Sequence, residues 1–298
     1  MFTGFVAIFY LSNCQRWDYN KFRKECILRN YSEQTCKIYT QNINKFLEWT
    51  GDKSIEDLSL DDARNYIYEL RINRKMSTQH CNGTHSALRF FFKYVLHKIW
   101  DQDYVPRMAN DIKLPRVISL ESVEKMIDTA TETRNKAIIS LLYSSGLRVG
   151  ELCRLKPEDI YMSTMQVYIR SGKNHSDHWT ILSQHTLELL IKYWKEYPVQ
   201  RENLFLTLRK PHTPLKKNAV EAMITKIGNE AGIPAMTPHV LRHSFASHMI
   251  ESGVPLEYIQ TMMGHRSPSS THRYIHVSSK ALMGIQSPLD HKGGNHNV

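Results

Sequence analysis

A helical period of apolar residues runs from about Tyr19 to Trp100 and then stops. The recurring apolar positions include Ile38, Ile43, Phe46, Leu47 and Trp49, at three- to four-residue spacing. Residues 101–117 lose this spacing and contain Pro106 and Pro115, which interrupt regular helix. A chain of 298 residues also exceeds the size, about 250 residues, at which a single core stops growing. We therefore predict two domains joined by a linker at 101–117.

The first domain is predicted to be a small helical bundle at 19–100, preceded by an extension at 1–18. Ser59 and Asp62 resemble a capping box before a helix at 63–70, and Ser77 can cap the next helix. The aromatic side chains follow the apolar stripe of these helices, so we expect them in the core and not at a base-stacking surface.

The second domain is predicted at 118–290, with a tail at 291–298. Its helices are expected at 120–129, 137–143, 151–155, 186–197, 217–231, 238–252 and 255–263. Ser119 is expected to cap the first of these helices. Gly232, Gly253 and Gly264 are expected to end the last three helices, one each. Short β-branched and aromatic runs at 165–169 and 179–182 predict a hairpin. The fold class is therefore mainly α with a small antiparallel β-sheet (α+β).

Composition is that of a globular protein with an excess of positive charge. Apolar residues make up 41% and charged residues 23% of the chain. Lys and Arg number 39 against 29 Asp and Glu, a net charge of +10. Both domains share the excess, so both could face a polyanion, although charge alone leaves a basic protein with no nucleic-acid role equally open.

The five cysteines are odd in number and scattered, without a CxxC pair. This pattern argues against a disulfide framework and against a zinc knuckle, and it fits a protein of the reducing cytosol. The apolar segment Phe2 to Leu11 lacks a basic n-region and a cleavage site and is too short to span a bilayer, so we expect a packed or frayed N-terminal segment and no membrane contact.

Histidine and arginine side chains gather in the predicted helix at 238–252. His239 and Arg242 are three residues apart on one face, with His243 beside them. An arginine binds phosphate oxygens bidentately, and a histidine beside it can transfer a proton near neutral pH. Taken alone, this pattern is also compatible with a structural histidine. His239 with His243, or His272 with His276, could instead bind a metal, but no carboxylate lies between either pair.

Four motifs occur in order along the chain. They are Ser145-Gly-Leu-Arg148-Val-Gly-Glu151-Leu, Pro238-His239-Val-Leu-Arg242-His243-Ser-Phe-Ala, Met263-Gly264-His265-Arg-Ser and Thr271-His-Arg-Tyr274-Ile-His-Val277. Their order and separations resemble those of the tyrosine recombinase (phage integrase) family, most closely its Xer-like, two-domain branch. The resemblance covers roughly residues 20–290. It implies a SAM-like core-binding domain followed by a tyrosine-recombinase catalytic domain.

The resemblance also implies a role for each matching residue. Arg148 and Arg242 would hold the non-bridging oxygens of the scissile phosphate, and Tyr274 would be the nucleophile that forms a 3′-phosphotyrosyl link. His239 matches the residue that accepts the phenolic proton, and His265 matches a phosphate hydrogen-bonding position. The family chemistry uses neither metal nor ATP, so no cofactor is expected.

Lys173, in the predicted hairpin, matches the general acid that protonates the departing 5′ oxygen. Here the chain departs from the family, because the usual Gly-Lys-Gly turn is Gly172-Lys173-Asn174 and a basic residue before the second strand is replaced at Asp177-His178. There are two alternatives: Lys156 could be the general acid instead, or Lys173 could be an ordinary surface lysine. We assign supporting roles to Glu151, which is expected to orient Arg148, and to His243.

The resemblance implies a site-specific DNA recombinase or integrase of the bacterial or archaeal cytoplasm. Its partners would be double-stranded DNA with inverted-repeat core sites and a homotetramer on DNA, or a heterotetramer with a related recombinase. The alternatives are a catalytically inactive DNA-binding regulator and a type IB topoisomerase-like enzyme. A short apolar helix predicted at 280–285 could dock on its own domain, but exchange with a neighbouring subunit, as in the family, is favoured.

Overall fold

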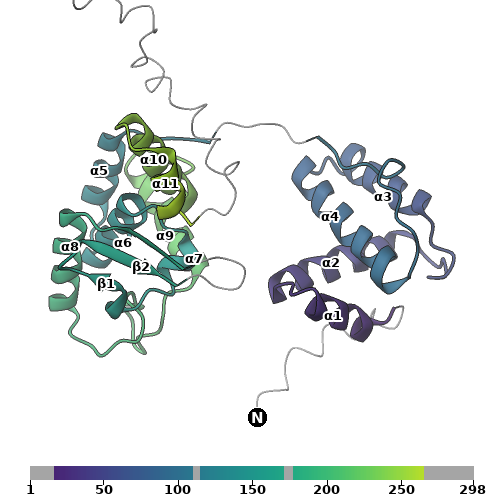
Figure 1. Cartoon of the computed structure of the whole chain (residues 1–298), viewed down its shortest axis with the longest axis horizontal. Helices are drawn as coiled ribbons and strands as arrows, with labels where there is room; N and C mark the ends of the chain where they lie inside the picture. Colours follow the sequence, from purple (N-terminus) through teal and green to yellow (C-terminus); the bar gives the residue numbers. More distant parts are fainter. Residues whose placement is uncertain (1–16, 110–114, 171–176, 265–298) are drawn as a thin grey trace, which may run out of the picture. The chain divides into compact units, whose positions relative to one another are not determined.

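The computed structural model describes residues 17–109, 115–170 and 177–264. The chain divides into two compact units, Met1–Ile112 and Lys113–Val298 (Figure 1). Each unit has a hydrophobic core of its own. None of the helices within the described ranges is long and apolar enough to cross a bilayer.

Unit 1 is entirely helical in its described part. Its elements are α1 (Tyr19–Leu28), α2 (Glu33–Trp49), α3 (Leu60–Ile72), α4 (Thr78–Phe90) and a π-helical turn (Phe91–Val95). Ser59 and Asp62 form the expected capping box at the start of α3, and Ser77 caps α4. Phe46, Phe91 and Phe92 are fully buried in the core between these helices. The prediction that the aromatic stripe forms the core is confirmed.

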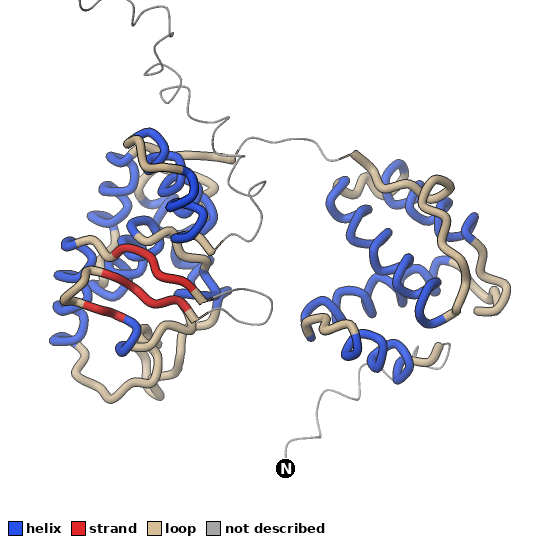
Figure 2. The backbone as a smooth tube through the Cα atoms, in the orientation of Figure 1, coloured by secondary structure: helices blue, strands red, loops and turns tan. Residues whose placement is uncertain are grey.

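Unit 2 packs helices against one face of a small sheet, whose strands alternate buried and exposed side chains. Its helices are α5 (Leu120–Thr129), α6 (Thr133–Ser144), α7 (Val149–Leu152), α8 (Gln184–Glu196), α9 (Lys217–Glu230), α10 (Pro238–Glu251) and α11 (Leu256–Met262), with a 3₁₀ turn at Pro157–Asp159. The strands are β1 (Ile160–Tyr161), β2 (Gln166–Ile169) and β3 (His178–Ile181). Figure 2 shows the three strands lying together against the helices of this unit.

The sheet has the order β1-β2-β3 and is antiparallel throughout. Val167 pairs with Thr180 in β3 and with Ile160 in β1, so the predicted hairpin is confirmed. Strand β1 was not predicted, because two residues are too few to show an alternating pattern. The mainly α fold with a small antiparallel sheet is confirmed.

Two helices in unit 2, α6 and α7, differ from the predictions by more than two residues at one end, whereas α8 to α11 differ by at most two. α6 begins at Thr133 and not at Ala137, because Thr133 is buried with the apolar face that follows. α7 spans Val149–Leu152 and not 151–155, because Glu151 caps the helix from its first turn. The three predicted C-cap glycines are confirmed: Gly232, Gly253 and Gly264 have φ of +73°, +81° and +59°.

Candidate active site

Arg148 follows a tight turn between α6 and α7. The turn depends on Gly146, which has φ +63° and lies so close to Phe245 of α10 that a Cβ would come within 2.4 Å of its ring. Only glycine meets both demands without strain. The turn places Arg148 at the N-cap of α7, where its side chain is 26% exposed. A ligand can therefore reach this guanidinium.

Arg242 lies in the middle of α10, a helix that starts with Pro238 in its first turn and is capped by Thr237. Its side chain is only 4% exposed. Nη1 donates to the Gly146 carbonyl at 2.6 Å, and Nη2 donates to the Met263 carbonyl at 2.7 Å. The guanidinium thus ties α10 to the turn before Arg148 and to the end of α11, which fixes its direction.

Glu151 connects the two arginines. Its Oε1 accepts from Nη1 of Arg148 at 2.7 Å, its Oε2 accepts from the backbone N–H of Arg148 at 2.8 Å, and Oε2 lies 3.7 Å from Nη1 of Arg242. Burial of this carboxyl would by itself raise its pKa. The hydrogen bonds from Arg148 and the charges of both arginines outweigh burial and hold the pKa of Glu151 below its ordinary value. The carboxylate therefore stays ionised between the two cations.

His239 and His243 lie one turn apart on the same helix as Arg242. Their rings are stacked, with centroids 6.2 Å apart and planes 29° from parallel. His239 is exposed on the first turn of α10, whereas His243 is half-buried. A ligand can therefore reach His239, whose ring stacks on that of His243. In the described ranges no cluster of three or more His, Cys, Asp or Glu side chains could hold a metal ion.

The remaining predicted site residues, Lys173, His265 and Tyr274, lie outside the described residues. The structure brings Arg148, Glu151 and Arg242 together and places His239 and His243 on the helix of Arg242. It also describes Gly264, the residue before His265. A Cβ on Gly264 would lie 2.5 Å from the ring of His178, which is buried at the start of β3.

Sequence reasoning did not identify the backbone groups that hold Arg242. The carbonyls of Gly146 and Met263 have no side-chain signature, and the contact between His178 and Gly264 joins segments far apart in the chain. The sequence did mark the two turns involved, because Gly146 and Gly264 stand at motif positions where a turn is required. A pair of guanidiniums oriented by one carboxylate can bind the oxygens of a single phosphate group, which is the chemistry expected of a phosphoryl-transfer site.

A helical first unit, followed by a second unit with a three-stranded sheet and two paired arginines, is the arrangement that the sequence motifs led us to expect of a tyrosine recombinase. The model of the phage integrase family matches residues 116–281, more than half of the chain, and the model of the phage integrase N-terminal SAM-like domain matches residues 19–102. The chain therefore belongs to the phage integrase family of tyrosine recombinases and is a site-specific recombinase that acts on DNA.

Relatives and solved structures agree with this membership. The chain is 33% identical over 259 residues to the tyrosine recombinase XerA of Pyrococcus furiosus, covering 86% of this chain and 87% of that protein. It is 30% identical over 279 residues to the tyrosine recombinase XerC of Bacillus pumilus, covering 86% and 90%. A crystal structure of XerA recombinase is similar at 27% identity, with a TM-score of 0.53 and coverage of 93% and 99%.

Proposed function

We propose that this recombinase cuts and rejoins DNA through a covalent link between Tyr274 and the 3′ phosphate of the broken strand. The observation that supports this most directly is the joint engagement of Arg148 and Arg242 by Glu151, which sets two cations side by side. Tyr274 comes from the motif that the family resemblance identifies.

Arg148 and Arg242 would bind the two non-bridging oxygens of the scissile phosphate. Negative charge builds on these oxygens in the pentacoordinate transition state, and donors that are already oriented stabilise it without reorganisation. Arg242 is held by two carbonyls and Arg148 by Glu151, so both are oriented before DNA binds. Removing either is expected to raise the barrier by about 3 to 4 kcal/mol.

The proposed step exchanges one ester for another. The Tyr274 oxygen attacks phosphorus, the bond from phosphorus to the 5′ oxygen breaks, and the phenolic proton passes to His239. Lys173 gives a proton to the departing 5′ oxygen, and His265 donates a hydrogen bond to the phosphate. A 5′-hydroxyl of the partner strand then reverses these steps. Because the ester is conserved, rejoining needs no ATP.

A nicked suicide duplex tests the covalent step. The substrate carries the inverted repeats that flank the gene, and cleavage releases a short fragment so that rejoining fails. We expect an SDS-resistant protein–DNA adduct with wild type and none with Tyr274→Phe. An adduct that survives this substitution would refute the role of Tyr274, and tight binding without any wild-type adduct would favour an inactive regulator. Relaxation of supercoils without a specific site would favour the topoisomerase-like alternative.

The role of Lys173 is tested by changing the leaving group. Lys173→Ala should bind DNA normally but cleave it slowly, because the 5′ alkoxide leaves poorly without a proton. A 5′-thiol leaving group needs no acid, so a substrate with a bridging sulfur should restore the rate. Lys156→Ala serves as the matched control. A defect that the sulfur does not relieve would exclude the general-acid role.

We further infer that copies of the chain assemble as tetramers on paired core sites in the cytoplasm, through the segment 280–285. Unit 2 has an open pocket of about 600 Å³ whose lining includes Leu120, Ile181, Phe245 and Met249. These apolar side chains suit the apolar helix predicted for that segment. Deleting residues 280–298 should leave binding to a single half-site intact and abolish synapsis in native gels, whereas unchanged synapsis would exclude this contact.

A further inference from the structure

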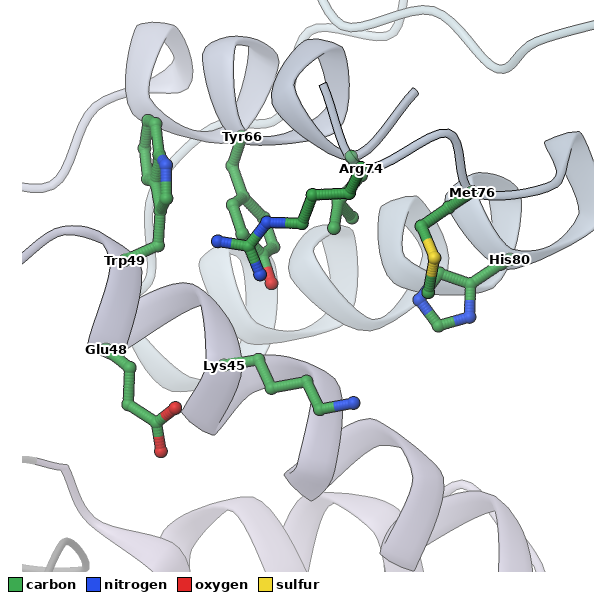
Figure 3. Close-up of a pocket in the computed structure, with 8 residues that line it drawn as sticks. Lys45, Glu48, Trp49, Tyr66, Arg74, Met76 and His80 are labelled. Carbon is green, nitrogen blue, oxygen red and sulfur yellow. The ribbon is translucent and has the colours of Figure 1, made fainter. Parts of the chain in front are cut away.

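Unit 1 contains an open pocket of about 350 Å³ between α2, the end of α3 and the start of α4. Its lining residues are Lys45, Glu48, Trp49, Tyr66, Leu70, Arg74, Met76 and His80 (Figure 3). None of them belongs to the candidate active site. The volume lies near the lower limit of about 300 Å³ for pockets that bind small organic groups.

One side of the pocket carries hydrogen-bond donors. Tyr66 is 1% exposed as a residue, and its hydroxyl group reaches the wall of the pocket (Figure 3). Lys45 is exposed and lines the same pocket, so its ammonium group adds a positive charge to this side. A hydroxyl group and an ammonium group at one wall of an open pocket can both donate to an anionic ligand that enters it. Burial raises the pKa of Tyr66, which keeps the phenol protonated as a donor.

Arg74 adds a second cation to this side. Figure 3 shows its guanidinium beside the hydroxyl of Tyr66. Nε of Arg74 lies 3.6 Å from the Glu69 carboxylate, a distance too long for a good hydrogen bond, and the side chain is 47% exposed. The guanidinium can therefore turn its fork toward an anion in the pocket. Lys75 follows it in sequence, and Arg71 lies three residues before it in the last turn of α3, so this end of the helix is basic.

The other side of the pocket is apolar. Trp49 lies 5.3 Å from the ring of Tyr66, and Met76 and Leu70 complete this wall. A bare phosphate ion would leave these surfaces without a contact. Glu48 lies below Trp49 in Figure 3, and its carboxylate disfavours a second anion at that edge. The lining therefore matches a ligand with one anionic group attached to a ring.

We propose that this pocket binds one nucleotide unit of the DNA backbone, its phosphate on Lys45, Arg74 and the Tyr66 hydroxyl and its sugar against Trp49 and Met76. The proposal rests on the proposed function, because it takes the DNA that the recombinase cuts as the source of the phosphate. A free nucleotide has the same chemistry, and the experiment separates the two sources. The pocket would thus fix the register of unit 1 along the duplex.

The test measures binding of the full chain to a core-site duplex by fluorescence anisotropy between 50 and 300 mM salt. Each phosphate contact contributes about 0.9 to the slope of log K against log salt. Lys45→Ala should lower the slope by about one and the affinity about tenfold. Lys45→Ala and Arg74→Ala combined should lose less than the sum of the single losses, because both side chains hold the same phosphate.

Tyr66→Phe isolates the hydroxyl without a change of charge. It should weaken binding about threefold to tenfold with an unchanged salt slope. Tyr68→Phe is its matched control, since Tyr68 lies two residues away on α3 and is 63% exposed. Lys24→Ala on α1 is the control for Lys45. Circular dichroism and thermal unfolding establish that every variant is folded.

Three results would overturn the proposal. Tyr66→Phe could bind like Tyr68→Phe, or Lys45→Ala like Lys24→Ala, or the double variant could show purely additive losses. A thermal shift with deoxyadenosine monophosphate, lost in Lys45→Ala, together with an unchanged DNA slope, would assign the pocket to a free nucleotide and exclude the DNA backbone. The adduct formed at saturating DNA reports on Tyr274 separately, so failure of the cleavage mechanism is distinguishable from failure of this site.

Discussion

Glu151 is a buried carboxylate that faces two guanidinium groups, and its replacement should be costly. Glu151→Gln keeps the shape and one acceptor but removes the carboxylate charge that faces the buried Arg242. Removing one partner of a buried ion pair costs about 3 to 5 kcal/mol. We expect the free energy of unfolding of unit 2 at pH 7 to fall by about 3 kcal/mol, measured by urea denaturation.

The pH dependence of this loss follows from the lowered pKa of Glu151. A carboxyl whose folded pKa lies below its ordinary value of 4.5 stabilises the fold above that value, and the contribution disappears as pH falls through the folded pKa. The stability difference between wild type and Glu151→Gln should therefore be constant from pH 7 to about 5 and shrink below pH 4.5. A difference that stays constant down to pH 3 would contradict the electrostatic origin.

Gly146 should tolerate no side chain, for two separable reasons. An alanine at φ +63° costs about 1 to 2 kcal/mol in backbone strain, and its Cβ would also overlap the Phe245 ring. Gly253 is the matched control in the same unit, because it has φ +81° and open space around it. We expect Gly146→Ala to lower the free energy of unfolding by about 2 kcal/mol more than Gly253→Ala. Equal losses would show that Phe245 moves aside freely.

At the scale of elements, the contact between β3 and α11 connects the hairpin to the carbonyl that holds Arg242. The ring of His178 fills the space where a Cβ on Gly264 would lie. Gly264→Ala should therefore displace Met263 and its hydrogen bond to Arg242. We expect at least a tenfold loss in the rate of adduct formation on the suicide duplex, about 1.4 kcal/mol, with unchanged DNA affinity.

The double variant His178→Ala/Gly264→Ala identifies the cause. Removing the ring makes room for the new methyl group, so the double variant should recover part of the rate that Gly264→Ala loses. Backbone strain at φ +59° would remain. If the two losses simply add, the contact between the ring and Gly264 does not determine the position of Met263.

The elements that sequence predicted well are those whose ends are marked by side chains. Ser59 and Ser77 cap their helices as expected, and glycines end three others. Strand β1 and the π-helical turn at Phe91–Val95 were missed, because one is too short for a period and the other continues the apolar stripe of α4. In the site, the arginines were predicted from motifs, whereas the carbonyls that orient Arg242 depend on tertiary packing alone.

At the scale of the whole molecule, each unit buries its own apolar side chains. The core of unit 1 draws on residues 17–105, and the cores of unit 2 draw on residues 118–263. Two-state behaviour is a property of single domains. We therefore expect two unfolding transitions in calorimetry of the full chain, one for each unit.

Phe46→Ala tests this assignment because Phe46 is fully buried in unit 1 and contacts Tyr66 and Phe92. Removing a buried phenylalanine costs about 3 to 5 kcal/mol, so one transition should shift to markedly lower temperature while the other stays in place. Ile138→Ala, in the core of unit 2, should move only the other transition. A parallel shift of both transitions in either variant would show that the two cores unfold as one cooperative unit.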